Sequence, residues 1–124
     1  MLNSIQYQTL KLNNRMHKEA NSYYVYMLAN KGCMVYTGVT GDLFRRVRQH
    51  RNGIGSKFTK KYSTHSLVWF EETDDIAVAI ETEKRIKSWR RQWKLVLVEA
   101  KNPDWRDLAD GWYEQSIDPE SSSG

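Results

Sequence analysis

The chain has 124 residues, of which 40% are hydrophobic and 12% are aromatic, and this is enough for one domain with a core of its own. No apolar run approaches the roughly 20 residues that a membrane-spanning helix needs, and the N-terminus lacks the apolar segment of a secretion signal. The single cysteine, Cys33, excludes an internal disulfide framework and a cysteine-based zinc site. We therefore expect a cytoplasmic protein that does not bind a membrane.

The positive charge is gathered in two parts of the chain. The net charge is only +4, but seven Lys or Arg residues and no acids lie between residues 45 and 61, and six more lie between residues 84 and 94 without an acid. Phosphate contacts give a protein sequence-independent affinity for nucleic acid, so separated basic tracts suit a polyanionic partner. An ordinary solvated face is the alternative interpretation.

The first third of the chain predicts an extension followed by a β-hairpin. Residues 1–21 have few apolar anchors and are expected to form a flexible extension. Residues 23–28 are aromatic or β-branched on both faces, which predicts a strand that is covered on two sides. Asn30-Lys31-Gly32 predicts a three-residue turn with Gly32 in the left-handed position, and residues 33–39 form the return strand.

The rest of the chain predicts helices and one more strand. Thr40-Gly41-Asp42 ends the hairpin and caps a helix over residues 43–51, and residues 52–62 are expected to form a flexible basic loop. Residues 67–70 predict a third strand, with helices over about residues 76–89 and 92–100. The order β-β-α-β-α-α predicts an α+β fold with a small three-stranded, mostly antiparallel sheet flanked by helices. Residues 22–100 then form the domain, residues 101–115 a C-terminal appendage packed on it, and residues 116–124 a disordered tail.

Two charged residues fall where helical periodicity predicts core positions. In the first helix Arg46 and His50 share a stripe with Leu43 and Val47. In the second helix Glu83 shares its stripe with Ile76, Ala79, Ile80 and Ile86. A charge directed into a core costs several kcal/mol unless it is paired or used. Arg46 and Glu83 therefore indicate either an ion pair between two helices or an active site.

Two tyrosines are predicted to lie side by side on the hairpin. A turn over residues 30–32 pairs residues whose numbers sum to 62, which places Tyr26 opposite Tyr36, with Cβ atoms about 4.5–5.5 Å apart. By itself such a pair is ordinary strand packing. Gly38 follows Tyr36 by two residues, and its missing side chain permits close approach by a ligand.

Together these residues resemble the GIY-YIG nucleases, specifically the small single-domain branch, and are similar to the catalytic domain of excision-repair nuclease subunits. Tyr24-Val25-Tyr26 stands at the first tripeptide of the family and Tyr36-Thr37-Gly38 at the second. Residues 42–50 match the arginine helix and residues 79–87 the acidic helix. The resemblance covers about residues 23–100. Tyr24, Val25 and Thr37 depart from the family letters, but both tyrosines are retained.

The resemblance implies metal-dependent hydrolysis of nucleic-acid phosphodiesters, with DNA as the expected substrate and low sequence specificity. Glu83 would hold one Mg²⁺ or Mn²⁺, and Arg46 would neutralise charge on the scissile phosphate. Tyr36 is the expected base and Tyr26 its orienting partner.

Further residues of the implied site have more than one interpretation. His50 is a second candidate for proton transfer, because its ordinary pKa lies near neutrality, or it caps the helix end. Arg45, Lys57 and Lys60 are the candidates for phosphate contacts. Two alternatives to an endonuclease stay open, namely a nucleic-acid-binding module that has lost turnover and a structural domain in which Arg46 and Glu83 form an ion pair.

Overall fold

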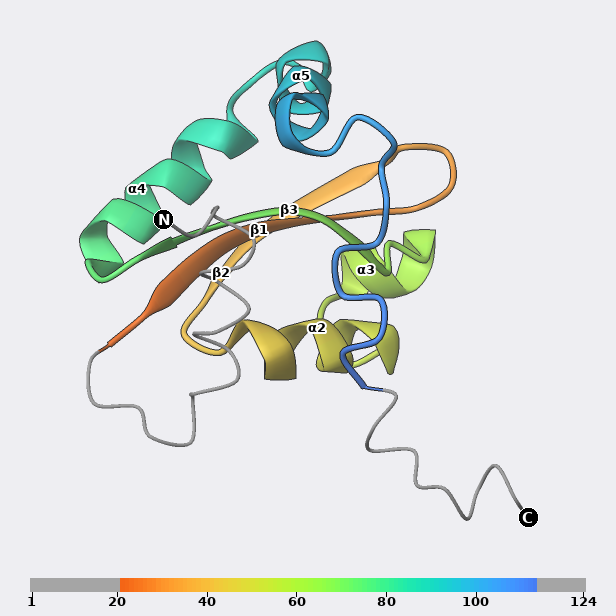
Figure 1. The fold of residues 1–124 in the computed structure, drawn as a ribbon, viewed down its shortest axis with the longest axis horizontal. Coiled ribbons are helices and arrows are strands. Elements are labelled where there is room, and N and C mark those ends of the chain that lie inside the picture. The colour runs from red at the N-terminus through yellow and green to blue at the C-terminus, as the bar shows by residue number, and fades with distance from the viewer. Residues whose placement is uncertain (1–20, 114–124) are drawn as a thin grey trace.

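The computed structural model describes residues 21–113, which form a three-stranded sheet covered by helices on both faces (Figure 1). The strands and helices, in chain order, are β1 (Tyr23–Ala29), β2 (Val35–Thr40), α2 (Leu43–Arg51), α3 (Lys57–Tyr62), β3 (Ser66–Thr73), α4 (Ile76–Lys87) and α5 (Arg91–Lys101). The predicted α+β class and the order of the predicted elements are confirmed, and one further helix, α3, lies between α2 and β3. The predicted tail, and the predicted extension apart from residue 21, lie outside the described residues.

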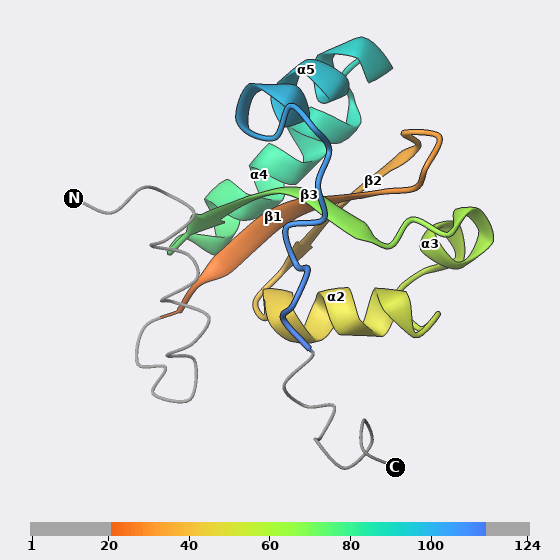
Figure 2. The same ribbon diagram turned by 45° about the vertical axis from the view of Figure 1, so that its right-hand side comes forward.

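The sheet has the order β2-β1-β3, and β1 pairs antiparallel with both neighbours. Alternate side chains of a strand point to opposite faces, so Tyr24, Tyr26 and Leu28 join the cluster that includes Leu43 and Val47 of α2. The intervening residues of β1 join the opposite cluster with side chains of α4 and α5. Figures 1 and 2 show α2 and α3 on one face of the sheet and α4 and α5 on the other. The central strand is therefore buried on both sides, as predicted.

A bulge interrupts the pairing of β1 with β3. The register changes between Met27, which pairs with Trp69, and Leu28, which pairs with Leu67. Val68 is the extra residue, and Val68 and Trp69 consequently both pack into the cluster beneath α4 and α5.

The hairpin register differs from the prediction by two residues. Paired residues sum to 64, so Tyr26 lies opposite Gly38, and Tyr36 lies opposite Leu28. The turn is longer than predicted because Asn30 closes it with both its carbonyl groups, accepting from the backbone of Cys33 and, through the side chain, from that of Met34. Cys33, with φ of 62°, takes the left-handed position that was predicted for Gly32. A shift of two keeps every side chain on its face, so the two tyrosines still share one side of the sheet.

The segment predicted as a flexible basic loop contains a helix, α3. Ser56 caps this helix by accepting from the backbone of Thr59, and Ser63 ends it in a left-handed conformation with φ of 54°. The two glycines before Ser56 are typical of a loop, so the sequence did not indicate that Ser56 caps a helix.

The apolar stripe predicted for α4 is only half correct. Ala79 and Ile86 are buried, but Ile76 is 50% exposed and Ile80 is 37% exposed. The helix also ends at Lys87, two residues earlier than predicted. The buried stripe of α4 is narrow, and the two isoleucines lie on the flank that also carries Glu83 and Lys87.

After α5 the chain crosses from one layer to the other along β3 (Figure 2). Asn102 donates to the carbonyl of Val68 at 3.0 Å, and Leu108 donates to that of Leu67 at 2.7 Å. Trp112 then stacks on Phe44 of α2 at a ring distance of 6.0 Å. This segment, residues 102–113, is called the C-terminal strap below.

Candidate active site at the edge strand

A buried hydrogen bond joins Tyr26 of β1 to His50 of α2. The Tyr26 hydroxyl lies 2.8 Å from His50 Nε2, and these two side chains are 1% and 0% exposed. Gly38 makes this possible, because a Cβ at that position would lie 2.5 Å from the Tyr26 hydroxyl. The space beside Gly38, expected to admit a ligand, is filled by the ring of Tyr26 itself.

Burial is the largest cause of the pKa shifts of both Tyr26 and His50. Burial, and then the nearby Tyr36, raise the pKa of Tyr26, although Arg46 opposes the shift. Burial and the positive charge of Arg46 lower the pKa of His50 from its ordinary 6.5 to about 4. Near neutral pH both groups are therefore uncharged, a phenol bonded to an imidazole.

Tyr36, on the edge strand β2, lies beside this pair and is only partly buried. Its ring centre is 6.3 Å from that of Tyr26, 5.2 Å from that of His50 and 5.9 Å from that of Phe58 in α3. Because Tyr26 is buried and Tyr36 is only partly buried, Tyr36 is the tyrosine that a substrate could reach.

Arg46 is half-buried, and its guanidinium is fixed by two acceptors. Nη1 donates to Gln49 Oε1 and Nη2 to the carbonyl of Gly55, each at 3.0 Å. These bonds use part of the guanidinium fork and leave other N–H groups for a ligand. Arg46 lies close enough to Tyr26 for its positive charge to oppose the rise in the pKa of that phenol.

Glu83 approaches the same cluster from the other face of the sheet. Its Oε2 lies 2.6 Å from Lys87 Nζ one turn further along α4, and this Nζ is 5.9 Å from the centre of the Tyr36 ring. Among the ion pairs of residues 21–113, none joins Arg46 to Glu83. The interhelical ion pair considered from the sequence is therefore wrong.

A hollow of about 430 Å³ lies between β2 and the first turns of α2. It is lined by Val39, Thr40, Gly41, Asp42, Arg45, Arg46 and Gln49. Arg46 thus faces both this hollow and the tyrosine cluster. Arg45 is exposed at its rim, and Lys57 and Lys60 are exposed on α3.

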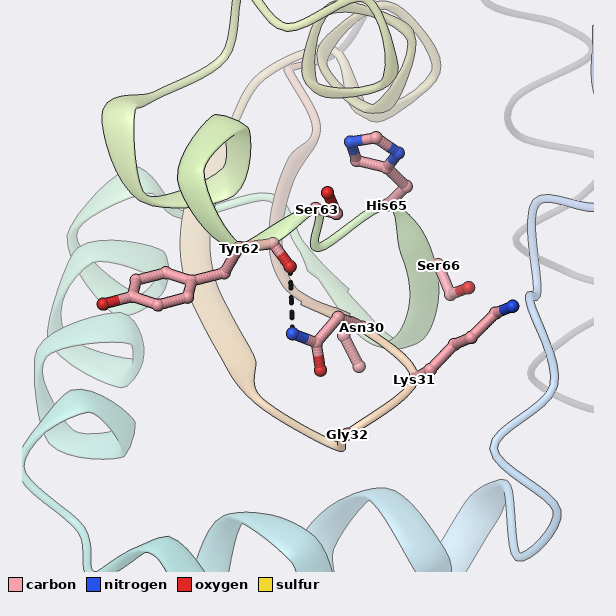
Figure 3. A pocket seen from close by; sticks show the side chains of 8 residues that line it. Asn30, Lys31, Gly32, Tyr62, Ser63, His65 and Ser66 are labelled. Atoms are coloured by element: carbon pink, nitrogen blue, oxygen red, sulfur yellow. Dashed lines mark hydrogen bonds between the residues drawn. The ribbon is translucent and has the colours of Figure 1, made fainter.

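A second hollow, of about 480 Å³, lies between the hairpin turn and the link from α3 to β3 (Figure 3). Asn30 Nδ2 donates to the carbonyl of Tyr62 at 2.9 Å and closes one side, and the phenol ring of Tyr62 points away from Asn30. None of the five candidate catalytic residues lines it.

With this geometry in place, comparison with known proteins decides the family. Residues 22–96 match the GIY-YIG catalytic domain. The chain belongs to the GIY-YIG family.

Relatives of this chain carry the name UPF0213 protein. A UPF0213 protein of Haloquadratum walsbyi is 40% identical over 77 residues, which are 62% of this chain and 86% of that protein. One of Staphylococcus saprophyticus is 36% identical over 63% of this chain and 95% of its own length. The solution NMR structure of a UPF0213 protein from Bacillus halodurans is 30% identical, with a TM-score of 0.48, and covers 73% of this chain and 96% of that one.

Membership places the chain in a nuclease family whose substrates are nucleic acids and whose members generally use divalent metal ions. In residues 21–113 no helix has the length and apolar character to span a membrane, and no three His, Cys, Asp or Glu side chains group as a metal site. A hard cation keeps several waters and takes one or two carboxylates plus phosphate oxygens. Glu83, with its side chain 13% exposed, therefore fits a metal bound jointly with nucleic acid, not one held by protein groups alone.

Four residues at this candidate site were not predicted from the sequence: Gln49, Gly55, Thr59 and Lys87. Gln49 follows Arg46 by three residues and Lys87 follows Glu83 by four, so helical spacing could have found both. Gly55 and Thr59 gave no signal, because residues 52–62 were expected to be a loop.

Proposed function

We propose that this chain is a metal-dependent endonuclease that hydrolyses nucleic-acid phosphodiesters, with DNA as its substrate and low intrinsic sequence specificity. The observation that carries the proposal is the meeting of groups around Tyr36. Tyr26 and His50 lie behind it, Arg46 borders the adjoining hollow, and Lys87 connects it to Glu83.

Tyr36 positions the attacking water and takes its proton. Lys87 Nζ lies 5.9 Å from the centre of the Tyr36 ring, where its positive charge would stabilise negative charge that develops on the phenol oxygen. Tyr26 is deeply buried and its pKa is raised, which suits an orienting phenol better than a base.

Arg46 stabilises negative charge that develops on the scissile phosphate. A planar guanidinium presents paired donors to phosphate oxygens. The hydrogen bonds to Gln49 and Gly55 fix the orientation of the Arg46 guanidinium before substrate binds. Glu83 binds Mg²⁺ or Mn²⁺ together with the substrate phosphate. The bound cation would polarise the phosphoryl group and stabilise the leaving oxygen.

The exposed cations Arg45, Lys57 and Lys60 bind neighbouring phosphates. Such contacts position a nucleic acid without reading its bases. We propose low specificity because the sequence contains no motif that marks an element for reading base edges. A cytoplasmic location and a role in DNA repair, which the resemblance to excision-repair nuclease subunits implies, are further parts of the proposal.

A binding module without turnover is the second candidate. The observation that favours it is the ion pair of Glu83 with Lys87, because Lys87 competes with a metal for the carboxylate.

The proposal is tested by incubating the protein with supercoiled plasmid and Mg²⁺ or Mn²⁺. A reaction with added chelator is the negative control. We expect nicking by the parent, none by Glu83→Gln, and a sharp fall in Tyr36→Phe and Arg46→Ala. Glu81→Gln is the matched control, because Glu81 is an exposed glutamate of the same helix that pairs with Arg85.

Two results would change the proposal. Full nicking by Glu83→Gln would remove Glu83 from the reaction. Salt-sensitive DNA binding without nicking by the parent would favour the binding module.

A further inference from the structure

A chain of buried polar groups continues behind the tyrosines. The Tyr26 hydroxyl contacts His50 Nε2 at 2.8 Å, and His50 Nδ1 lies 3.0 Å from Thr59 Oγ1. Thr59 is 0% exposed, like His50. These hydrogen bonds link β1, α2 and α3. Thr59 is not among the residues that the family resemblance identified.

The partners of Thr59 decide the direction of its single hydroxyl proton. The carbonyl of Ser56 lies 3.2 Å from Thr59 Oγ1 and can only accept, so Thr59 donates to it. Ser56 Oγ, at 3.1 Å, is free to donate to Thr59 in return. The remaining contact, with His50 Nδ1, then requires the proton to be on Nδ1. A neutral imidazole carries one N–H, so Nε2 accepts from Tyr26.

The opposite tautomer satisfies fewer contacts. Thr59 would have to donate to Nδ1 and would lose its bond to the Ser56 carbonyl. His50 Nε2 would donate to Tyr26, whose own proton would then turn to the hydroxyl of Tyr36, because a guanidinium can only donate. The bond that Thr59 loses to the carbonyl of Ser56 therefore decides between the tautomers.

Gly55 fixes the ring of His50 as well. A Cβ on Gly55 would lie 1.9 Å from His50 Nδ1, so the backbone of this loop packs directly on the imidazole. Gly55 limits where the ring can lie, and Thr59 decides which of its nitrogens carries the proton.

We propose that Thr59 is a positioning residue of the site, which holds His50 as the Nδ1–H tautomer so that Tyr26 donates inward and turns its lone pairs toward Tyr36 and Arg46. The consequence for cleavage rests on the proposed function, whereas the tautomer does not. A neutral phenol that is fixed in this way accepts from its neighbours and orients the hydroxyl of Tyr36. Hydrogen-bond partners of metal-ligating residues typically contribute about 10- to 100-fold in activity, and we expect an effect of the same order for the partner of His50.

The test combines histidine nitrogen NMR with cleavage kinetics on the full chain. In the parent, His50 is expected as the Nδ1–H tautomer. Thr59→Val should give a mixture of tautomers and a fall in kcat of about tenfold or more with KM unchanged, and Thr59→Ser should restore both. Thr64→Val is the matched control: Thr64 is also buried, and within the described residues its hydroxyl has no hydrogen-bond partner.

An Nε2–H tautomer in the parent would overturn the proposal, as would a folded Thr59→Val variant whose tautomer and kcat match those of the parent. If Thr59→Val does not fold, the parent's tautomer and its retention in Thr59→Ser decide instead. A parent that does not cleave DNA would contradict the proposed function alone, because the nitrogen signals of His50 still report the arrangement.

Discussion

At Gly55 two parts of the site depend on one residue without a side chain. Its carbonyl accepts from Arg46. Its Cα lies so close to the ring of His50 that a Cβ would clash with the imidazole. Gly38 has the same relation to Tyr26. Glycine is therefore required at these two positions, because each packs against a side chain of the candidate site.

The variant Gly55→Ala is expected to lose about 1–3 kcal/mol of unfolding free energy, because the new methyl group must displace the imidazole or the loop. Cleavage should fall further than stability predicts, since Arg46 and His50 both move. Gly41→Ala is the control, because a Cβ there has its nearest neighbour at 3.9 Å. Equal denaturation midpoints for the two variants would contradict this account.

The lowered pKa of the buried His50 also makes the unfolding free energy depend on pH. Its pKa is lowered to about 4 from 6.5, so its contribution is complete above pH 6.5 and is lost as the pH falls through 4. The contribution is on the order of 3 kcal/mol. Urea unfolding at a series of pH values should show the loss, and His50→Gln should flatten the curve between pH 6.5 and 4. A variant with the parent's acid sensitivity would show that other groups cause it.

At the scale of elements, the C-terminal strap connects the two helical layers. Asp107 accepts from the backbone of Leu67 at 3.0 Å and of Ala109 at 3.1 Å, and its other oxygen pairs with Arg51 of α2. One carboxylate therefore ties the strap to both β3 and α2.

Asp107→Ala should destabilise the domain by about 1–3 kcal/mol, because it leaves the Leu67 N–H and the Arg51 guanidinium without this acceptor. Asp110→Ala, an exposed aspartate of the same strap, should stay within about 0.5 kcal/mol of the parent. Thermal melts of the two variants compare them directly, and an equal shift would mean that the carboxylate of Asp107 contributes little.

Elements were predictable where a local pattern decides them. The strands follow from their apolar runs, and α2 follows from its Asp42 cap and its spacing, which also put Arg46 and His50 together. The hairpin register was not predictable, because Cys33 adopts a left-handed conformation that its residue type does not indicate. The approach of Glu83 to Tyr36, like the packing of Gly55 on His50, depends on how helices dock on the sheet, and no local pattern encodes that.

For the whole molecule, the proposed function predicts salt-dependent binding to DNA. Each phosphate contact lowers the slope of log affinity against log salt by about 0.9. Replacing Lys57 and Lys60 by Ala should therefore make the slope shallower by about 2 without changing sequence preference. Lys101→Ala is the control, because Lys101 pairs with Glu71 elsewhere on the surface. An unchanged slope in the double variant would exclude α3 from the binding surface.

In the proposed reaction Tyr36, Arg46 and Glu83 act around one metal-bound phosphate. Paramagnetic broadening by Mn²⁺, measured with a short cleavage-resistant DNA duplex, tests this arrangement. We predict strong broadening of the Tyr36 and Glu83 amide signals that disappears in Glu83→Gln. Broadening centred on the acidic residues 71–75 and unaffected by Glu83→Gln would contradict the account.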